Sequence, residues 1–214
     1  ARSGLMNMLS AGETEIAYRG AGTIADQIGG TLLAQGILLA IIARERFGIG
    51  QYVEVPHLGA ALLLQAQALN GYLLNKDLPR GGNEKRMGSP LFNVYRCQDD
   101  KWLAVGFIQP LEHRWEDVCQ ALGLENLINE PKFVDLQDGS SEAKELTALF
   151  DGIYAQKPRS EWLAILKAHN AVCAPVQGYE EIEDDPQVIA NDLIVRIEHP
   201  DHGEIREVGS PITV

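Results

Sequence analysis

The sequence predicts an α/β fold class, with an α+β arrangement in a smaller second domain. One observation is a helix–strand–helix block, formed by a helical pattern at residues 23–47, an alternating segment at 51–55 and an apolar helical pattern at 58–74. The other is a hairpin pattern after residue 90, followed by further helices and a last hairpin. The 214 residues, 45% of them hydrophobic, suffice for one sizeable core or a core with a smaller lobe.

The first predicted helix begins at Thr23 and ends near Phe47, where Gly48 supplies a C-cap. Its longest apolar stretch, residues 28–43, is interrupted by Gln35 and three glycines. This stretch falls short of the roughly 20 apolar residues that a membrane span requires. We therefore expect a core helix and no membrane partner.

A polar stretch rich in glycine and proline, residues 75–89, predicts a domain boundary. Beyond it, segments 91–97 and 101–107 flank a polar turn and predict a hairpin. Helices are then expected from Pro110 to Gly123, over 143–154 with a start at Ser140-Ser141, and over 161–168 with Ser160 as the cap. The last hairpin pairs 193–198 with 204–208, and we expect the small-domain core to contain Trp102, Trp115 and Trp162.

Charge and cysteine content restrict the possible partners. The net charge of −12 repels phosphate backbones, so nucleic acid is not expected as a partner. The three cysteines lack CxxC spacing, which predicts neither a disulfide framework nor a zinc site and fits a reducing cytoplasm. The histidines and carboxylates show no metal-ligand spacing, so we expect no metal.

Several ordered motifs resemble one enzyme family. The matching segments are TIADQIGG at 23–30, GIL at 36–38, RERFGIGQYVEV at 44–55, RGGN at 80–83, SPLFNVYRC at 89–97 and APV at 174–176. In these motifs the chain is similar to the family III CoA-transferases, the CaiB/BaiF family. The resemblance covers nearly the whole chain, but only the central part of a full-length family member.

The resemblance implies a fragment of the family III CoA-transferase fold. Residues 1–75 would form part of a Rossmann-like large domain that carries the catalytic helix, and residues 76–190 would form the small domain. Residues 191–214 would be a hairpin that returns toward the large domain. Because the family forms interlocked dimers, the resemblance also implies a homodimer.

Asp26 has two compatible interpretations. Thr23 and Asp26 match the capping-box spacing, in which a first-turn carboxylate also complements the helix dipole. The resemblance implies that Asp26 is also the nucleophile, which forms a mixed anhydride with the acyl group of an acyl-CoA and then an aspartyl-CoA thioester. We therefore predict CoA transfer from an acyl-CoA to a carboxylic acid acceptor. No cofactor is expected, since the CoA thioester is the substrate.

Other residues are predicted to bind CoA or the acyl group. Gly29 and Gly30 would leave room for the thioester. The resemblance places His57 near the acyl group, although a lone histidine at the end of a strand is more often structural. The strongest local cluster of positive charge consists of Arg80, Lys85 and Arg86. These side chains could bind CoA phosphates or lie in a solvated loop.

Gln109 bears on the racemase branch of the family. In that branch a Glu faces a His–Asp unit across the alpha carbon, and the matching position here is Gln109. A neutral amide cannot act as a general base, so this departure favours transfer. Racemisation of a 2-methylacyl-CoA remains an alternative. A second alternative is that the chain is a truncated, catalytically inactive fragment, because part of the expected CoA site lies outside this chain.

Overall fold

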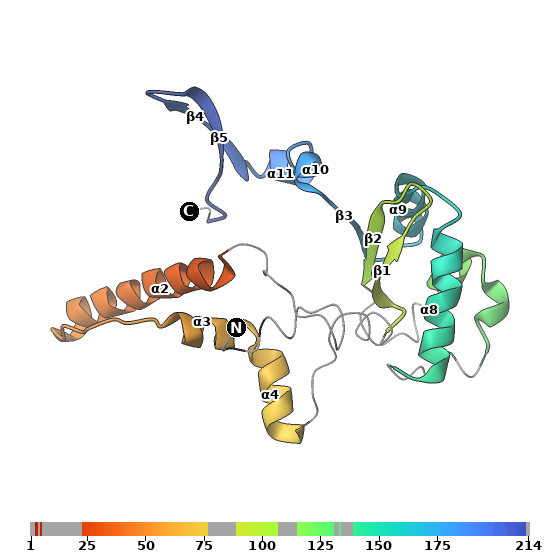
Figure 1. The fold of residues 1–214 in the computed structure, drawn as a ribbon, viewed down its shortest axis with the longest axis horizontal. Helices are drawn as coiled ribbons and strands as arrows, with labels where there is room; N and C mark the ends of the chain where they lie inside the picture. The colour runs from red at the N-terminus through yellow and green to blue at the C-terminus, as the bar shows by residue number, and fades with distance from the viewer. Residues whose placement is uncertain are drawn as a thin grey trace. The chain divides into compact units, whose positions relative to one another are not determined.

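The computed structural model describes residues 3, 5, 23–76, 89–106, 115–130, 133 and 139–212. The chain divides into two compact units, Ala1–Ser89 and Pro90–Val214. The α/β class is confirmed, since the described part of the first unit is helical and the second combines helices with two antiparallel sheets (Figure 1). The finer division into 1–75, 76–190 and 191–214 stays a prediction.

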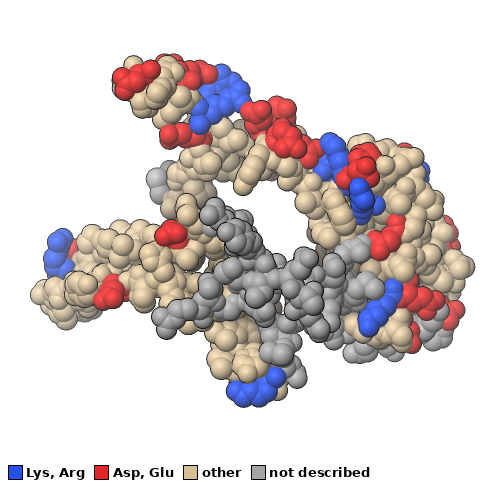
Figure 2. All heavy atoms as spheres, viewed as in Figure 1, with Lys and Arg blue, Asp and Glu red and all other residues tan. Residues whose placement is uncertain are grey.

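Helix α2, Ile24–Phe47, has the predicted extent. It ends at Gly48, which takes a left-handed conformation (φ 71°) and bonds through its N–H to the Arg44 carbonyl at 2.9 Å. Figure 2 shows the helix as largely uncharged surface with basic side chains at its C-terminal end, where they complement the helix dipole.

The expectation that α2 is a core helix is wrong for the described residues. Gly29 is the one buried residue of α2, because the main packing partner of the helix among the described elements is the short helix α3, His57–Leu64. By length and composition alone α2 could also cross a membrane, a test that core helices of soluble proteins pass as well. The absence of a membrane partner therefore stays a prediction.

The predicted strand at 51–55 is an extended segment without strand pairing. Val53 and Val55 are half-buried between exposed neighbours, so the alternation that suggested a strand is present. The segment runs back along α2 (Figure 1), and a Cβ on Gly36 would lie 2.8 Å from Val53 Cγ1. No described strand pairs with the segment, and inter-strand hydrogen bonds are what define a strand.

The predicted helix at 58–74 is divided into α3 and α4, Ala66–Asn75. The division falls at Gln65, whose backbone (φ −108°, ψ 21°) leaves the helical region. The Gln65 side chain donates to the Ala61 carbonyl at 3.0 Å and to the Ser3 carbonyl at 2.6 Å. No glycine or proline marks this break in the sequence.

The predicted hairpin after residue 90 is confirmed. Strands β1, Phe92–Arg96, and β2, Trp102–Gly106, pair antiparallel, and the edge strand β3, Cys173–Val176, pairs with β2. Tyr95 and Leu103 face each other in this register and are both fully buried. Trp102 is 38% exposed and was wrongly expected in the core, because alternation along β2 places it on the opposite face from Leu103.

Helices α6, Trp115–Leu122, α8, Ser141–Tyr154, and α9, Arg159–Ala168, supply most of the remaining core of the second unit. Ser140 caps α8 as predicted, accepting from the Ala143 N–H at 3.1 Å. Ser160 is not the cap of α9, since Pro158 in an extended conformation occupies that position. The predicted start of α6 at Pro110 lies outside the described residues.

Aromatic rings form the centre of this core. Tyr95 stacks on Tyr154 with ring centroids 4.6 Å apart, and Trp162 meets Tyr154 edge-on at 5.2 Å. Two buried polar atoms of these rings have backbone partners: Tyr95 Oη donates to the Pro90 carbonyl and Trp162 Nε1 to the Tyr154 carbonyl. Trp162 and Trp115 are buried as the sequence predicted.

The chain continues through elements that the sequence did not reveal. The 3-10 turn η2, Glu125–Leu127, follows α6, and the short helices α10, Tyr179–Ile182, and α11, Pro186–Ala190, follow β3. Strands β4, Ile194–His199, and β5, Gly203–Val208, then form the last hairpin as predicted.

Candidate functional site

Asp26 lies in the first turn of α2, at the positive end of the helix dipole. The first backbone hydrogen bond of the helix joins the Gln27 N–H to the Thr23 carbonyl at 2.9 Å. The Thr23 side chain makes no capping hydrogen bond, because its backbone (φ −90°, ψ 52°) departs from the extended conformation typical of a cap. The capping box is therefore not formed, because the hydrogen bond predicted from the Thr23 side chain is missing. The N–H groups of residues 24–26 precede the first helical hydrogen bond.

His57 contacts Asp26 directly. Its Nε2 lies 3.2 Å from Asp26 Oδ1, and the two side chains are 67% and 63% exposed. His57 begins α3 immediately after Pro56, which takes an extended conformation (ψ 136°) at the cap position. The contact thus joins the first residue of α3 to the first turn of α2, although 31 positions separate the two in the sequence.

The two glycines of the predicted site differ in their surroundings. A Cβ on Gly29 would lie 3.4 Å from His57 Cδ2, so Gly29 lies under the imidazole ring. Gly30 is exposed, and a Cβ there would meet nothing within 4 Å. The predicted room for a ligand therefore exists beside Gly30, whereas His57 occupies the space above Gly29.

Four of the predicted binding residues cannot be placed in this site. Arg80, Lys85, Arg86 and Gln109 lie outside the described residues. The roles of Arg80, Lys85 and Arg86 in a CoA-phosphate site, and of Gln109 in binding the substrate or CoA, remain predictions.

The cysteines are poor alternative nucleophiles. Burial, with a smaller contribution from Asp99, raises the pKa of Cys97 to about 11. Burial, together with Glu125, raises the pKa of Cys119 to about 12. Burial also raises the pKa of Cys173. Because the thiolate is the reactive form, burial disfavours all three cysteines as nucleophiles at neutral pH.

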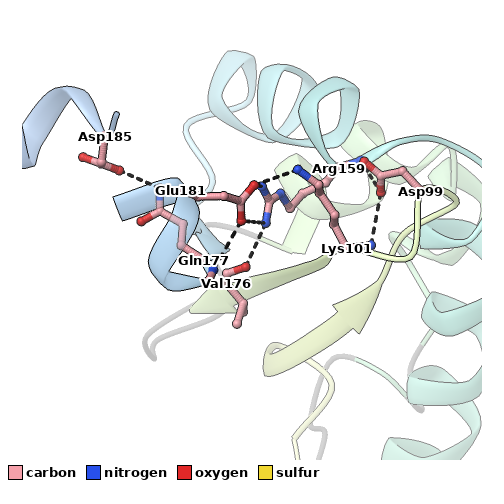
Figure 3. A network of polar contacts seen from close by, with 8 residues as sticks. Asp99, Lys101, Arg159, Val176, Gln177, Glu181 and Asp185 are labelled. Atoms are coloured by element: carbon pink, nitrogen blue, oxygen red, sulfur yellow. Dashed lines mark hydrogen bonds and ion pairs between the residues drawn. The ribbon is translucent and has the colours of Figure 1, made fainter. Parts of the chain in front are cut away.

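A second polar cluster joins the start of α9, the turn between β1 and β2, the end of β3 and α10 in the second unit (Figure 3). Arg159 is 9% exposed, and its guanidinium donates to both carboxylate oxygens of Glu181 and to the Val176 carbonyl, the last at 2.8 Å. Lys101 Nζ reaches Glu181 Oε1 at 2.7 Å, and Asp99 accepts from the Arg159 backbone N–H at 3.2 Å. The cluster fixes α10 to the sheet. No sequence motif predicts the pairing of Arg159 with Glu181, which lie 22 positions apart.

We predict that Glu181 makes the stability of this unit sensitive to acid. Hydrogen bonds from Arg159, then from Lys101, lower the pKa of Glu181 from 4.5 to about 2. The ionised form is thus favoured in the folded state, so its contribution is complete above pH 4.5 and is lost as the pH falls toward 2. The Glu181→Gln variant should unfold at lower urea concentration than the parent at neutral pH, and the gap should close across this range.

Glu180 provides the matched control, since this neighbouring glutamate is exposed. Glu180→Gln should shift the urea midpoint little at any pH. A gap between the parent and Glu181→Gln that stays constant from neutral pH down to pH 2 would contradict the assignment.

Comparison with known proteins agrees with the family resemblance of the sequence motifs. The family model for CoA-transferase family III matches residues 1–214. Formyl-CoA:oxalate CoA-transferase of Streptomyces avermitilis is 29% identical over 206 residues, which cover 88% of this chain and 49% of that protein. Human alpha-methylacyl-CoA racemase is 31% identical over 161 residues, covering 74% of this chain and 40% of the racemase. The sequence resemblance noted above is confirmed.

The fold has a counterpart among solved structures. The crystal structure of Rv3272 from Mycobacterium tuberculosis matches with a TM-score of 0.77 at 22% identity, over 100% of this chain and 55% of that one. The chain spans about half the length of the curated relatives it matches.

Proposed function

Because the chain belongs to CoA-transferase family III, we propose that this protein transfers CoA from an acyl-CoA thioester to a carboxylic acid, with Asp26 as the acyl acceptor. The observation that carries the proposal is the position of Asp26. Its carboxylate is exposed in the first turn of α2, beside the open space at Gly30. Homologues named as CoA-transferases support the same class of reaction.

The surroundings of Asp26 suit a nucleophilic carboxylate. The helix dipole favours the ionised form, which is the form that attacks a carbonyl. The backbone N–H groups of residues 24–26 precede the first helical hydrogen bond and point along the helix axis toward its N-terminus. Donors in this position stabilise negative charge that develops during acyl transfer.

The reaction proceeds through two kinds of covalent intermediate, an aspartyl anhydride and an aspartyl-CoA thioester. An oxygen of Asp26 bonds to the acyl carbon, the thioester C–S bond breaks, and CoA leaves as the thiolate. The thiolate then bonds to the aspartyl carbonyl carbon, and the first carboxylic acid departs as its carboxylate with the bridging oxygen. The acceptor carboxylate reverses both steps: it displaces CoA to form a new anhydride, and the thiolate takes the new acyl group and releases Asp26.

Trapping the intermediate tests the proposal. The purified full-length protein is incubated with acyl-CoA thioesters, beginning with formyl-CoA and oxalate, the pair in the name of the Streptomyces relative. Hydroxylamine should convert the activated carboxylate into a hydroxamate, and peptide mass mapping should locate it on Asp26. Transfer without any hydroxamate on Asp26 would exclude the proposed intermediate.

Racemisation of a 2-methylacyl-CoA is the second candidate. The observation in its favour is the His57–Asp26 contact, since a paired histidine and carboxylate can exchange a proton with a substrate, and the human relative is a racemase. Incorporation of solvent deuterium at the alpha carbon without an acceptor acid would indicate racemisation. Transfer to the acceptor without deuterium uptake would indicate the first candidate.

A further inference from the structure

His57 can form a hydrogen bond with Asp26 in one direction only. His57 Nε2 lies 3.2 Å from Asp26 Oδ1, and an ionised carboxylate can only accept hydrogen bonds. When Nε2 carries the proton, a rotation of the imidazole ring directs its N–H at Oδ1. The contact involves Oδ1, so the attack on the acyl carbon falls to Oδ2.

The backbone of α2 supports this arrangement. The His57 ring lies above Gly29, where a Cβ would already contact His57 Cδ2 at 3.4 Å. Gly29 is also the buried residue of α2, so the ring and the helix pack together at this point. A side chain larger than a methyl group at position 29 would displace the ring from Asp26.

Fold stability does not account for the pair. Both side chains are more than 60% exposed, and ion pairs with that exposure contribute little to stability. A nitrogen that lies 3.2 Å from a carboxylate oxygen of the proposed nucleophile has a chemical use instead.

We propose that His57 is a catalytic hydrogen-bond donor to the aspartyl carbonyl oxygen during CoA transfer. This inference depends on the proposed function. When Oδ2 bonds to the acyl carbon, Oδ1 becomes the carbonyl oxygen of the aspartyl anhydride. When the CoA thiolate then bonds to the aspartyl carbon, an electron pair moves onto Oδ1 until the carboxylate that carries Oδ2 leaves. His57 Nε2 lies 3.2 Å from the oxygen that receives this charge, so its N–H can donate to that oxygen while the proton stays on the imidazole.

The role predicts which step slows when the donor is lost. Formation of the anhydride places negative charge on the substrate oxygen, which His57 does not contact in this arrangement. Formation and turnover of the aspartyl-CoA thioester place charge on Oδ1. Loss of His57 should therefore delay the second step and give water more time to hydrolyse the anhydride.

The test compares His57→Phe with His57→Gln in the full-length protein. Removal of one oxyanion donor lowers kcat about 10²- to 10³-fold, so we expect a loss of that order in His57→Phe with little change in KM for the acyl-CoA. His57→Phe should also release more CoA by hydrolysis per transfer event. His57→Gln retains an N–H donor near the position of Nε2 and should recover most of the transfer rate.

Two controls separate the possible failures. His202→Phe, in the exposed turn between β4 and β5, is the matched substitution and should keep the parent rate. Asp26→Asn is measured in parallel: if it transfers CoA at the parent rate, the proposed function fails and the role of His57 with it. If Asp26→Asn is inactive while His57→Phe keeps the parent rate and the parent ratio of hydrolysis to transfer, the role of His57 alone is wrong. Equal losses in His57→Phe and His57→Gln, without increased hydrolysis, also overturn it.

Discussion

Replacement of Asp26 by alanine should lower the rate of CoA transfer by at least about 10³-fold, because a covalent mechanism has no route without its nucleophile. The expected loss lies in kcat, since the carboxylate is required for chemistry and the rest of the binding surface stays in place. Steady-state kinetics with a matched acyl-CoA and acceptor pair measure the loss. The hydroxylamine-sensitive adduct should disappear with it.

Two further variants separate catalysis from helix stabilisation. Asp26→Asn keeps the size of the side chain and removes the carboxylate, so it should be as inactive as Asp26→Ala. Glu54→Gln makes the same chemical change at an exposed position in the neighbouring segment and should keep the parent rate. If Asp26 only complements the helix dipole, Asp26→Ala would cost about 0.3–1 kcal/mol of stability and leave kcat unchanged.

Replacement of Phe150 by alanine should destabilise the second unit by about 3–5 kcal/mol, the range for removal of a buried aromatic ring. Phe150 is 1% exposed and meets Tyr95 edge-on with ring centroids 5.9 Å apart. Its loss would leave a cavity between α8 and β1, which the stacked Tyr95 and Tyr154 rings are poorly placed to fill. Urea unfolding followed by tryptophan fluorescence should report the change, because Trp115 and Trp162 are buried in the same core.

Leu149 is the matched control on the same helix. It precedes Phe150 by one position and is 39% exposed, so Leu149→Ala should cost much less than Phe150→Ala. Equal losses from the two substitutions would show that the aromatic cluster is not the centre of the core.

The elements that the sequence located correctly are those with strong local signals. The end of α2 at Gly48 follows from the need for a left-handed C-cap, and the start of α8 follows from the Ser140 cap. The β1–β2 hairpin follows from alternation around a turn in which Asp100 takes a positive φ of 62°. Each signal depends on residues within a few positions of one another.

The caps predicted at Thr23 and Ser160 failed on local backbone geometry, whereas other failed predictions depended on more distant partners. The segment at 51–55 alternates like a strand but pairs with none of the described strands, and Gln65 divides a continuous apolar pattern through bonds from its side chain. The extent of α2 was predictable, whereas its exposure depends on which surfaces pack against it. Burial is a property of the surrounding chain, and periodicity within one helix cannot report it.

The candidate site divides in the same way. The sequence by itself determined that Asp26 stands in the first turn of a helix within a motif of CoA-transferase family III. Only the tertiary structure decided that His57 Nε2 lies 3.2 Å from Oδ1 of Asp26 and that Gly29 lies under the imidazole ring. The physical reason is that helix position follows from neighbouring residues, whereas a contact between two helices requires the intervening chain to turn back on itself.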